Sequence, residues 1–244
     1  MGAFVITLSR SEIPADTASD TASWPVDATS RMNRMYRSQR HIYDITRRYY
    51  LLGRDQLIAR LRPAAGEAVL EVGCGTGRNL IQAAKKYPNA SFFGLDVSTE
   101  MLTSAIEGIS RAGLTKTVRV AHGDATAFKP QPLFGRAAFD HVMISYSLSM
   151  IPNWGAVIER AIGSLRDGGR LHIVDFGDQR GLPRLVRTLL RQWLAMFDVT
   201  PRDDLEKVLA QVAARSGAEL TFERPFRGYA QYAVLTLPAR QTMP

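Results

Sequence analysis

The stretch Ala68-Val69-Leu70-Glu71-Val72-Gly73-Cys74-Gly75-Thr76-Gly77 decides the fold of this chain. Its first half is a short apolar run that predicts a buried strand, and its second half is a glycine loop. A helical pattern follows from Asn79 to Lys86 and is closed by Pro88. Glycines between a strand and a helix let the backbone turn sharply and approach a ligand closely, because no Cβ stands in the way. The stretch therefore predicts a ligand-binding turn at the end of a buried strand.

Strands and helices alternate beyond this loop. Apolar runs predict strands at 91–96, 117–124, 139–151 and 170–176, with helical patterns at 99–113 and 154–169. Alternation of this kind indicates βαβ units and a parallel sheet. Two further runs, 218–226 and 229–237, are joined at Arg227-Gly228 and predict an antiparallel pair. The expected fold class is α/β: a Rossmann-like, doubly wound, mainly parallel seven-stranded sheet with an antiparallel C-terminal strand pair and added N-terminal helices.

The chain divides into three segments by composition. Residues 1–30 are expected to form a flexible tail, because 9–30 are rich in Ser, Thr, Asp, Ala and Pro without apolar periodicity. Residues 31–62 switch to Arg, Tyr and aliphatic residues and predict a helical lid or substrate segment. Residues 63–244 form the expected ligand-binding domain. With 244 residues, 45% of them hydrophobic, one main core is the default.

Composition excludes several classes of site and location. A single cysteine, Cys74, rules out an intramolecular disulfide, and the four histidines have no metal-ligand spacing, so no metal is predicted. No stretch approaches the roughly 20 apolar residues of a membrane span, and the first segment lacks the pattern of an export signal. We therefore expect a cytoplasmic protein. The net charge of +8 favours an anionic partner, either nucleic acid or an anionic lipid surface.

The spacing of the glycine loop favours one kind of ligand. A dinucleotide-binding loop would place its third glycine at position 78, which is Arg78, so the spacing is G-x-G-x-G. The acidic Glu71 before the loop would repel a pyrophosphate. Asp96 and Asp124 end the next two predicted strands, where a carboxylate can accept hydrogen bonds from a ribose diol or an adenine amine. Alone, a carboxylate at a strand end is more often a helix cap or a loop residue.

Together, the ExGxGxG loop, Asp96 and Asp124 resemble the motifs of class I S-adenosylmethionine-dependent methyltransferases, over a span from Ala68 to Phe176. The resemblance implies S-adenosylmethionine as cofactor, S-adenosylhomocysteine as product and no metal. It implies a cofactor site composed of Glu71, Gly73, Gly75 and Gly77 around the methionine part, Asp96 at the ribose, Val97 and Met101 beside the adenine, and Asp124 and Ala125 at the adenine edge. Ser145 and Tyr146 would line the methyl-transfer site.

Two flanking segments carry a narrower resemblance. Residues 36–55 and 226–230 resemble bacterial N-methyltransferases that make betaine lipids by methylating diacylglyceryl homoserine three times. This implies an amine-bearing lipid as substrate. Methyltransferases acting on phosphatidylethanolamine, a quinone or another small amine are the alternatives. An RNA-binding or RNA-modifying protein is disfavoured, because the sequence has no appended RNA-binding motif.

Arginines gather in two segments that favour an anionic membrane surface. Residues 31–62 hold nine arginines and two acids. In 181–197, Arg184, Arg187 and Arg191 recur on one helical stripe, with Arg180 one turn earlier, and apolar residues fill much of the remaining circumference. This helix either lies in a membrane interface, which would place the protein peripherally on the inner face of the cell membrane, or packs on the sheet. The sequence leaves both open, as it does the oligomeric state.

Methyl transfer to an amine is an in-line displacement that depends mainly on positioning. Tyr43, Tyr146 and Tyr229 are candidates for positioning the amine, because aromatic rings attract a cationic amine and a hydroxyl can orient a lone pair. No dedicated general base is evident in the sequence.

Overall fold

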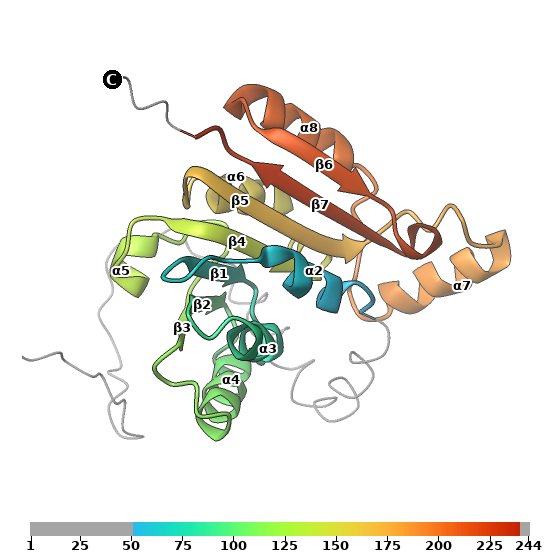
Figure 1. Cartoon of the computed structure of the whole chain (residues 1–244). Helices are drawn as coiled ribbons and strands as arrows, with labels where there is room; N and C mark the ends of the chain where they lie inside the picture. Colours follow the sequence, from blue (N-terminus) through green and yellow to red (C-terminus); the bar gives the residue numbers. More distant parts are fainter. Residues whose placement is uncertain (1–50, 240–244) are drawn as a thin grey trace, which may run out of the picture.

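A seven-stranded sheet forms the centre of the computed structural model, which describes residues 51–239 (Figure 1). The strand order is β3-β2-β1-β4-β5-β7-β6. The strands are β1 (Ala68–Val72), β2 (Ser91–Asp96), β3 (Val118–His122), β4 (Phe139–Ser145), β5 (Leu165–Phe176), β6 (Glu219–Glu223) and β7 (Ala230–Thr236). Strands β1 to β5 are mutually parallel, whereas β7 runs antiparallel to both β5 and β6. The predicted fold class, including the antiparallel C-terminal pair, is confirmed.

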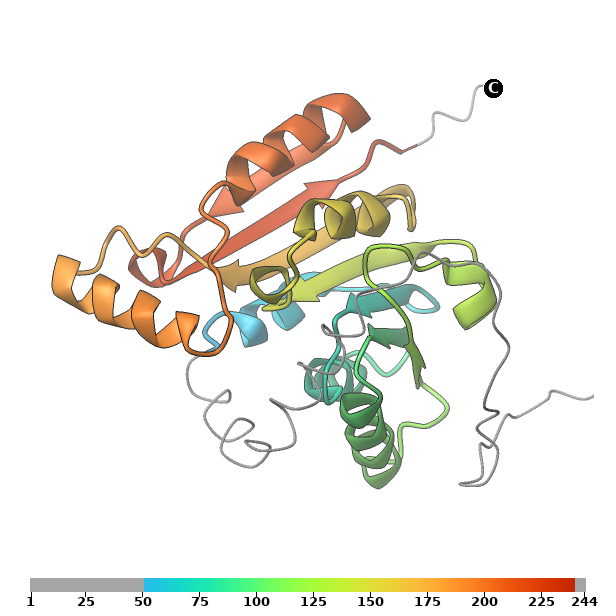
Figure 2. The same ribbon diagram turned by 180° about the vertical axis from the view of Figure 1, so that it is seen from behind.

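Helices cover both faces of the sheet (Figures 1 and 2). On one face, α2 (Arg54–Leu61), α3 (Arg78–Lys86) and α4 (Thr99–Arg111) share a core with Val69 of β1. On the other, α5 (Pro130–Phe134), α6 (Trp154–Ile162) and α8 (Leu205–Ser216) share a core with Leu70. Adjacent residues of β1 therefore point to opposite faces, as the pleat requires. Helix α7 (Arg184–Ala195) projects from the edge of the body, and two short 3₁₀ turns, η1 (Leu148–Met150) and η2 (Phe226–Gly228), complete the described chain.

Two predicted boundaries are wrong for reasons of tertiary contact. The helix expected over 154–169 ends at Ile162, and Leu165 already pairs with Phe139 as the first residue of β5. Leu165 is buried, so strand pairing in the core overrides the helical pattern. The strand expected over 139–151 ends at Ser145, because Tyr146 adopts a left-handed conformation with φ of 54° and η1 follows. Helices α5 and α8 were not predicted.

Parts of the expected architecture lie outside the described residues. The expected tail, 1–30, and residues 31–50 of the expected lid are among them, and so is Tyr43. The described end of the lid segment is α2, whose Leu57 and Leu61 are fully buried against the sheet. Among the described residues, no helix is long and apolar enough to cross a membrane.

Candidate functional site

The carboxyl ends of the central parallel strands lie level with one another. Val72 of β1 pairs with Leu95 of β2 and with Ile144 of β4, so the glycine loop emerges beside Asp96 and Ser145. The helix that follows β1 covers one face of the sheet, and the helix that follows β4 covers the other. Chain connections therefore diverge between β1 and β4, which is where open α/β sheets bind ligands.

The first and second glycines of the loop have different roles. The backbone N–H groups of Gly73 and Cys74 both donate to the carbonyl of Leu95, at 2.8 and 2.9 Å. A Cβ on Gly73 would lie 2.7 Å from the Cβ of Ser147, so this glycine is required by packing against the chain after β4. Gly75 also has a positive φ, of 52°, but a Cβ there would meet nothing within 4 Å. Its backbone faces open space, as expected where a ligand approaches.

Asp96 joins the glycine loop to the end of β2. Its two carboxylate oxygens accept hydrogen bonds from the backbone N–H of Gly75 at 2.7 Å and of Ser98 at 2.9 Å. Ser98 in turn caps α4 through the N–H of Met101. Each carboxylate oxygen carries two lone pairs, so an oxygen that accepts a backbone N–H can also accept a ligand hydroxyl.

The side chains expected around an adenine come from two neighbouring loops. Asp124 accepts hydrogen bonds from the backbone N–H and the hydroxyl of Thr126, at 2.8 and 2.7 Å. A ring nitrogen of His122 lies 3.1 Å from the carbonyl of Val97 and bonds the two loops together. Met101, at the start of α4, is buried and packs against Met150 and Phe197. Ala125 packs against the core on the α5 face of the sheet.

Glu71 is almost completely buried beneath the loop, and the sequence does not reveal its surroundings. Its Oε1 accepts a 2.7 Å hydrogen bond from the Nδ2 of Asn79, and among the described residues its Oε2 has no hydrogen-bond partner. Burial raises the pKa of Glu71 to about 8, opposed by the bond from Asn79 and the charge of Arg54. In the protein without a ligand this carboxyl is largely protonated at neutral pH. In that protonated state Glu71 repels a pyrophosphate less than the charged carboxylate that the sequence suggests.

An aromatic cluster stands where β4 and β5 end. The ring of Phe176 makes edge contacts with those of Tyr146 and Tyr229, at centroid distances of 4.7 and 5.9 Å. The hydroxyl of Tyr146 donates to the carbonyl of Leu52 at 2.5 Å, which ties the segment before α2 to the end of β4. Ser145 precedes it, and its buried hydroxyl has no hydrogen-bond partner in the described part of the chain. The roles of Ser145, Tyr146 and Tyr229 stay predictions.

Asp175 is a site residue that sequence analysis missed. It is fully buried near the end of β5, where its carboxylate accepts hydrogen bonds from the backbone N–H of Ser149 at 3.2 Å and of Phe176 at 2.7 Å. Burial raises its pKa to about 6. The carboxylate thus holds the turn that follows β4. An acid in the otherwise apolar run 173–176 was the only signal in the sequence, and it does not show what the acid contacts.

This arrangement fits S-adenosylmethionine, which carries a sulfonium, an amino acid group, a ribose and an adenine. The open side of Gly75 and the strand-end carboxylates of Asp96 and Asp124 suit its hydroxyls and positive charges, and the Oε2 of Glu71 is a further polar atom beneath the loop. No group of three or more His, Cys, Asp or Glu able to hold a metal occurs within residues 51–239.

Residues 63–213 match the family described as "Methyltransferase domain", and the chain belongs to this family. It is 30% identical over 154 residues to the ubiquinone/menaquinone biosynthesis C-methyltransferase UbiE of Allorhizobium ampelinum, covering 61% of this chain and 56% of that protein. It is likewise 30% identical over 154 residues to the O-methyltransferase cnsE of Penicillium expansum, covering 62% and 53%. The chain spans about half the length of the curated relatives it matches.

Solved structures share the fold. Phosphoethanolamine N-methyltransferase 2 of Haemonchus contortus, solved with S-adenosylhomocysteine, superposes with a TM-score of 0.67 and 16% identity, covering 89% of this chain and 61% of that one. The YcgJ protein of Bacillus subtilis superposes with a TM-score of 0.59 and 14% identity, covering 77% and 98%. The chain therefore has the Rossmann-like fold of S-adenosylmethionine-dependent methyltransferases.

Proposed function

We propose that this protein is an S-adenosylmethionine-dependent N-methyltransferase that methylates the amino group of diacylglyceryl homoserine three times to give a betaine lipid. We choose nitrogen as the methyl acceptor because of the aromatic cluster at the carboxyl ends of β4 and β5, which consists of Tyr146, Phe176 and Tyr229. Aromatic rings attract a cationic amine by about 0.5–2 kcal/mol, and the attraction persists when the nitrogen becomes quaternary. An aromatic wall therefore serves a repeatedly methylated nitrogen better than a hydroxyl acceptor.

When bound, S-adenosylmethionine supplies a methyl group on a sulfonium whose thioether is already a good leaving group. The protein's own residues then have to bind, position and desolvate. Asp96 and Asp124 would hold the nucleoside, and the backbone of Gly75 would allow its close approach. Positioning of this kind can contribute about 7–11 kcal/mol to catalysis.

The tyrosines differ in what they can offer an amine. Tyr146 is almost fully buried, and its hydroxyl already donates its proton to the carbonyl of Leu52. Tyr229 is half-buried and reachable from outside the core. We assign Tyr229 the orienting of the acceptor amine and Tyr146 the wall behind it. Asp175 holds the turn 147–150 in place and acts as a positioning residue.

The assignment to Tyr229 has a kinetic test. Tyr229→Phe should keep cofactor affinity and lower kcat about three- to tenfold, the usual value of one hydrogen bond. Tyr87→Phe is the matched control, because its hydroxyl donates to the carbonyl of Ile58 on α2. That control should affect stability and leave kcat unchanged. Equal loss of cofactor affinity and kcat in Tyr229→Phe would contradict the orienting role.

A quinone ring carbon is the second candidate acceptor, favoured by the similarity to the UbiE protein. Incubation with labelled S-adenosylmethionine and a panel of diacylglyceryl homoserine, phosphatidylethanolamine, a demethylated quinone and RNA separates the candidates by mass. Three successive methyl additions to the homoserine lipid are expected. If only the quinone is methylated, the acceptor is a ring carbon and the proposed amine acceptor is refuted.

A further inference from the structure

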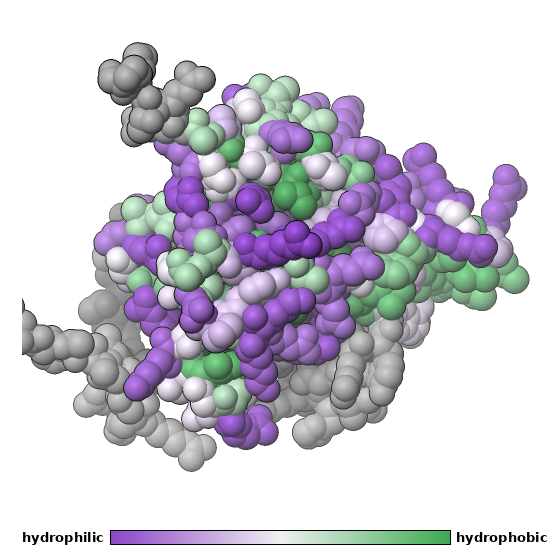
Figure 3. Space-filling model, in the orientation of Figure 1, coloured by the Kyte–Doolittle hydropathy of each residue, from purple (hydrophilic) through white to green (hydrophobic). Residues whose placement is uncertain are grey.

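Large apolar side chains are exposed mainly on one part of the molecule. Seven are exposed among the described residues, and four of these belong to α7 and the residue that follows it: Leu185 (71% exposed), Val186, Leu189 and Met196 (78%). Two more, Leu52 and Phe226, lie where the start of α2 meets η2, and only Ile106 on α4 stands elsewhere. Figure 3 shows this apolar surface along α7, with hydrophilic residues beside it.

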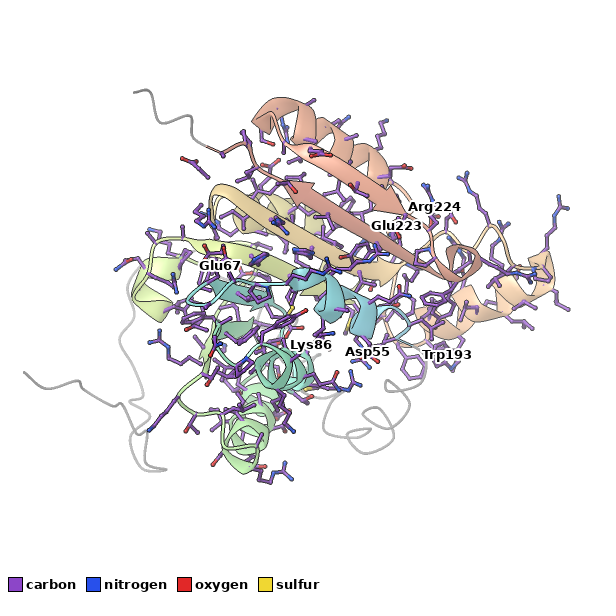
Figure 4. The ribbon with its side chains drawn as sticks, in the orientation of Figure 1. Asp55, Glu67, Lys86, Trp193, Glu223 and Arg224 are labelled. Atoms are coloured by element: carbon purple, nitrogen blue, oxygen red, sulfur yellow. The ribbon has the colours of Figure 1, made fainter. Side chains whose placement is uncertain are left out.

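One side of α7 is anchored, which leaves the other free. Leu194 is buried, and Leu190, Trp193 and Phe197 pack against the core on the α2 face (Figure 4). Leu185, Leu189 and Met196 are spaced by four and seven residues and so share a second, outward stripe. This helix therefore packs on the body, and it also presents an apolar stripe to its surroundings.

The arginines of this segment fall into two groups, those in ion pairs with the body of the protein and those without. Arg180 forms an ion pair with Asp178 at 3.2 Å, and Arg191 forms one with Asp203 at 2.6 Å. Arg184 and Arg187 have no ion-pair partner within residues 51–239. The expected four-arginine stripe thus provides two arginines for a partner. By helical spacing they lie on the side of α7 away from the apolar stripe, as the basic and apolar faces divide in helices that lie in a membrane interface.

We propose that α7 docks this protein on an anionic lipid bilayer, with the stripe of Leu185, Leu189 and Met196 among the acyl chains and with Arg184 and Arg187 at the headgroups. The segment just after α7 reaches the candidate site, because Phe197 packs against Met101. Docking would therefore bring the methyl-transfer site to the membrane surface. This inference rests on the proposed function only for the identity of the lipid that is methylated.

Charge favours a bilayer over the other occupants of such a surface. A second copy of this chain, paired through the same apolar stripe, would cover that stripe and leave Arg184 and Arg187 outside the contact. An RNA would use the arginines and leave the apolar stripe in water. Anionic lipids satisfy both features, since each arginine near such a surface and each buried apolar side chain adds to binding.

Vesicle flotation of the full chain without methyl donor tests the docking alone. The vesicles hold phosphatidylglycerol in phosphatidylcholine, with pure phosphatidylcholine for comparison. Leu185→Gln/Leu189→Gln should lower binding to the anionic vesicles at least about tenfold, as should Arg184→Gln/Arg187→Gln. Ile106→Gln is the control for an exposed apolar residue, and Arg160→Gln/Lys207→Gln, on the far helices α6 and α8, is the control for charge. Both controls should bind as the parent does.

Each outcome decides a different statement. Binding that the leucine variant retains in full would overturn the docking proposal, as would a dimer in light scattering that this variant dissociates. Vesicle binding without methylation of any amine lipid would support docking and refute the proposed acceptor. Methylation of detergent-dispersed homoserine lipid without vesicle binding would support the proposed acceptor and refute the docking.

Discussion

Replacing Glu71 by glutamine should remove a pH-dependent weakness from the core of this protein. Burial raises the pKa of Glu71 from the usual 4.5 to about 8, so the folded protein keeps a proton that the unfolded chain releases. The stability that Glu71 contributes is therefore fully present below pH 4.5 and is lost as the pH rises to 8. Glutamine cannot titrate, has nearly the same size, and keeps an oxygen that accepts the hydrogen bond from Asn79.

The magnitude follows from that difference in pKa. At about 1.4 kcal/mol per pH unit, the parent should lose about 4 kcal/mol between pH 5 and pH 9 through Glu71 alone. This is a large part of the roughly 5–15 kcal/mol by which most domains are stable. Urea unfolding of the parent and Glu71→Gln at pH 5, 7 and 9 measures it. The difference in free energy of unfolding between variant and parent should shift in favour of the variant by that amount.

A matched control separates this effect from the general change in charge. Glu107→Gln replaces an exposed glutamate on α4, and its free energy of unfolding should follow that of the parent at all three pH values. Parallel pH profiles of the parent and Glu71→Gln would refute the reasoning, because they would mean that Glu71 does not titrate over this range in the folded state.

Three further predictions concern the glycine loop, its carboxylate and the buried histidine pair. Gly75→Ala should cost only about 1 kcal/mol in stability but abolish cofactor binding in calorimetry, because the added Cβ would enter the open space of the site. Gly66 also has a positive φ and nothing within 4 Å of an added Cβ, so Gly66→Ala is the control and should leave binding unchanged. Asp96→Asn should weaken S-adenosylhomocysteine binding about 10- to 100-fold with the fold retained by circular dichroism, and unchanged affinity would exclude contact with the ribose. Burial lowers the pKa of His172 to about 3, so its contribution to stability is lost as the pH falls below about 6.5. Between pH 7 and pH 5, His172→Gln should lose about 2 kcal/mol less free energy of unfolding than the parent, as measured by urea unfolding. An equal loss in both proteins would mean that His172 is not the source of the acid sensitivity.

Local patterns in the sequence determined the sheet and pointed to the candidate site. The apolar run 68–72, its glycine loop and the strand-end acids Asp96 and Asp124 are all visible within short windows. Periodicity and glycine spacing report on the backbone of the same segment, and the right-handed βαβ connection leaves few ways to arrange such segments. The strand alternation therefore predicted the fold class, which is confirmed, and the edge of the sheet at which the candidate site residues gather.

Tertiary structure alone decided how the site residues are ionised and partnered. Glu71 bonds Asn79 of α3 and faces the charge of Arg54 on α2, and its raised pKa depends on the depth of burial, which no spacing reveals. The end of α6 depends on the pairing of Leu165 with Phe139. Arg191, which the sequence places on a basic stripe, forms an ion pair with Asp203. Desolvation and pairing are set by neighbours brought together from distant parts of the chain, whereas helix and strand periodicity is set within a few residues.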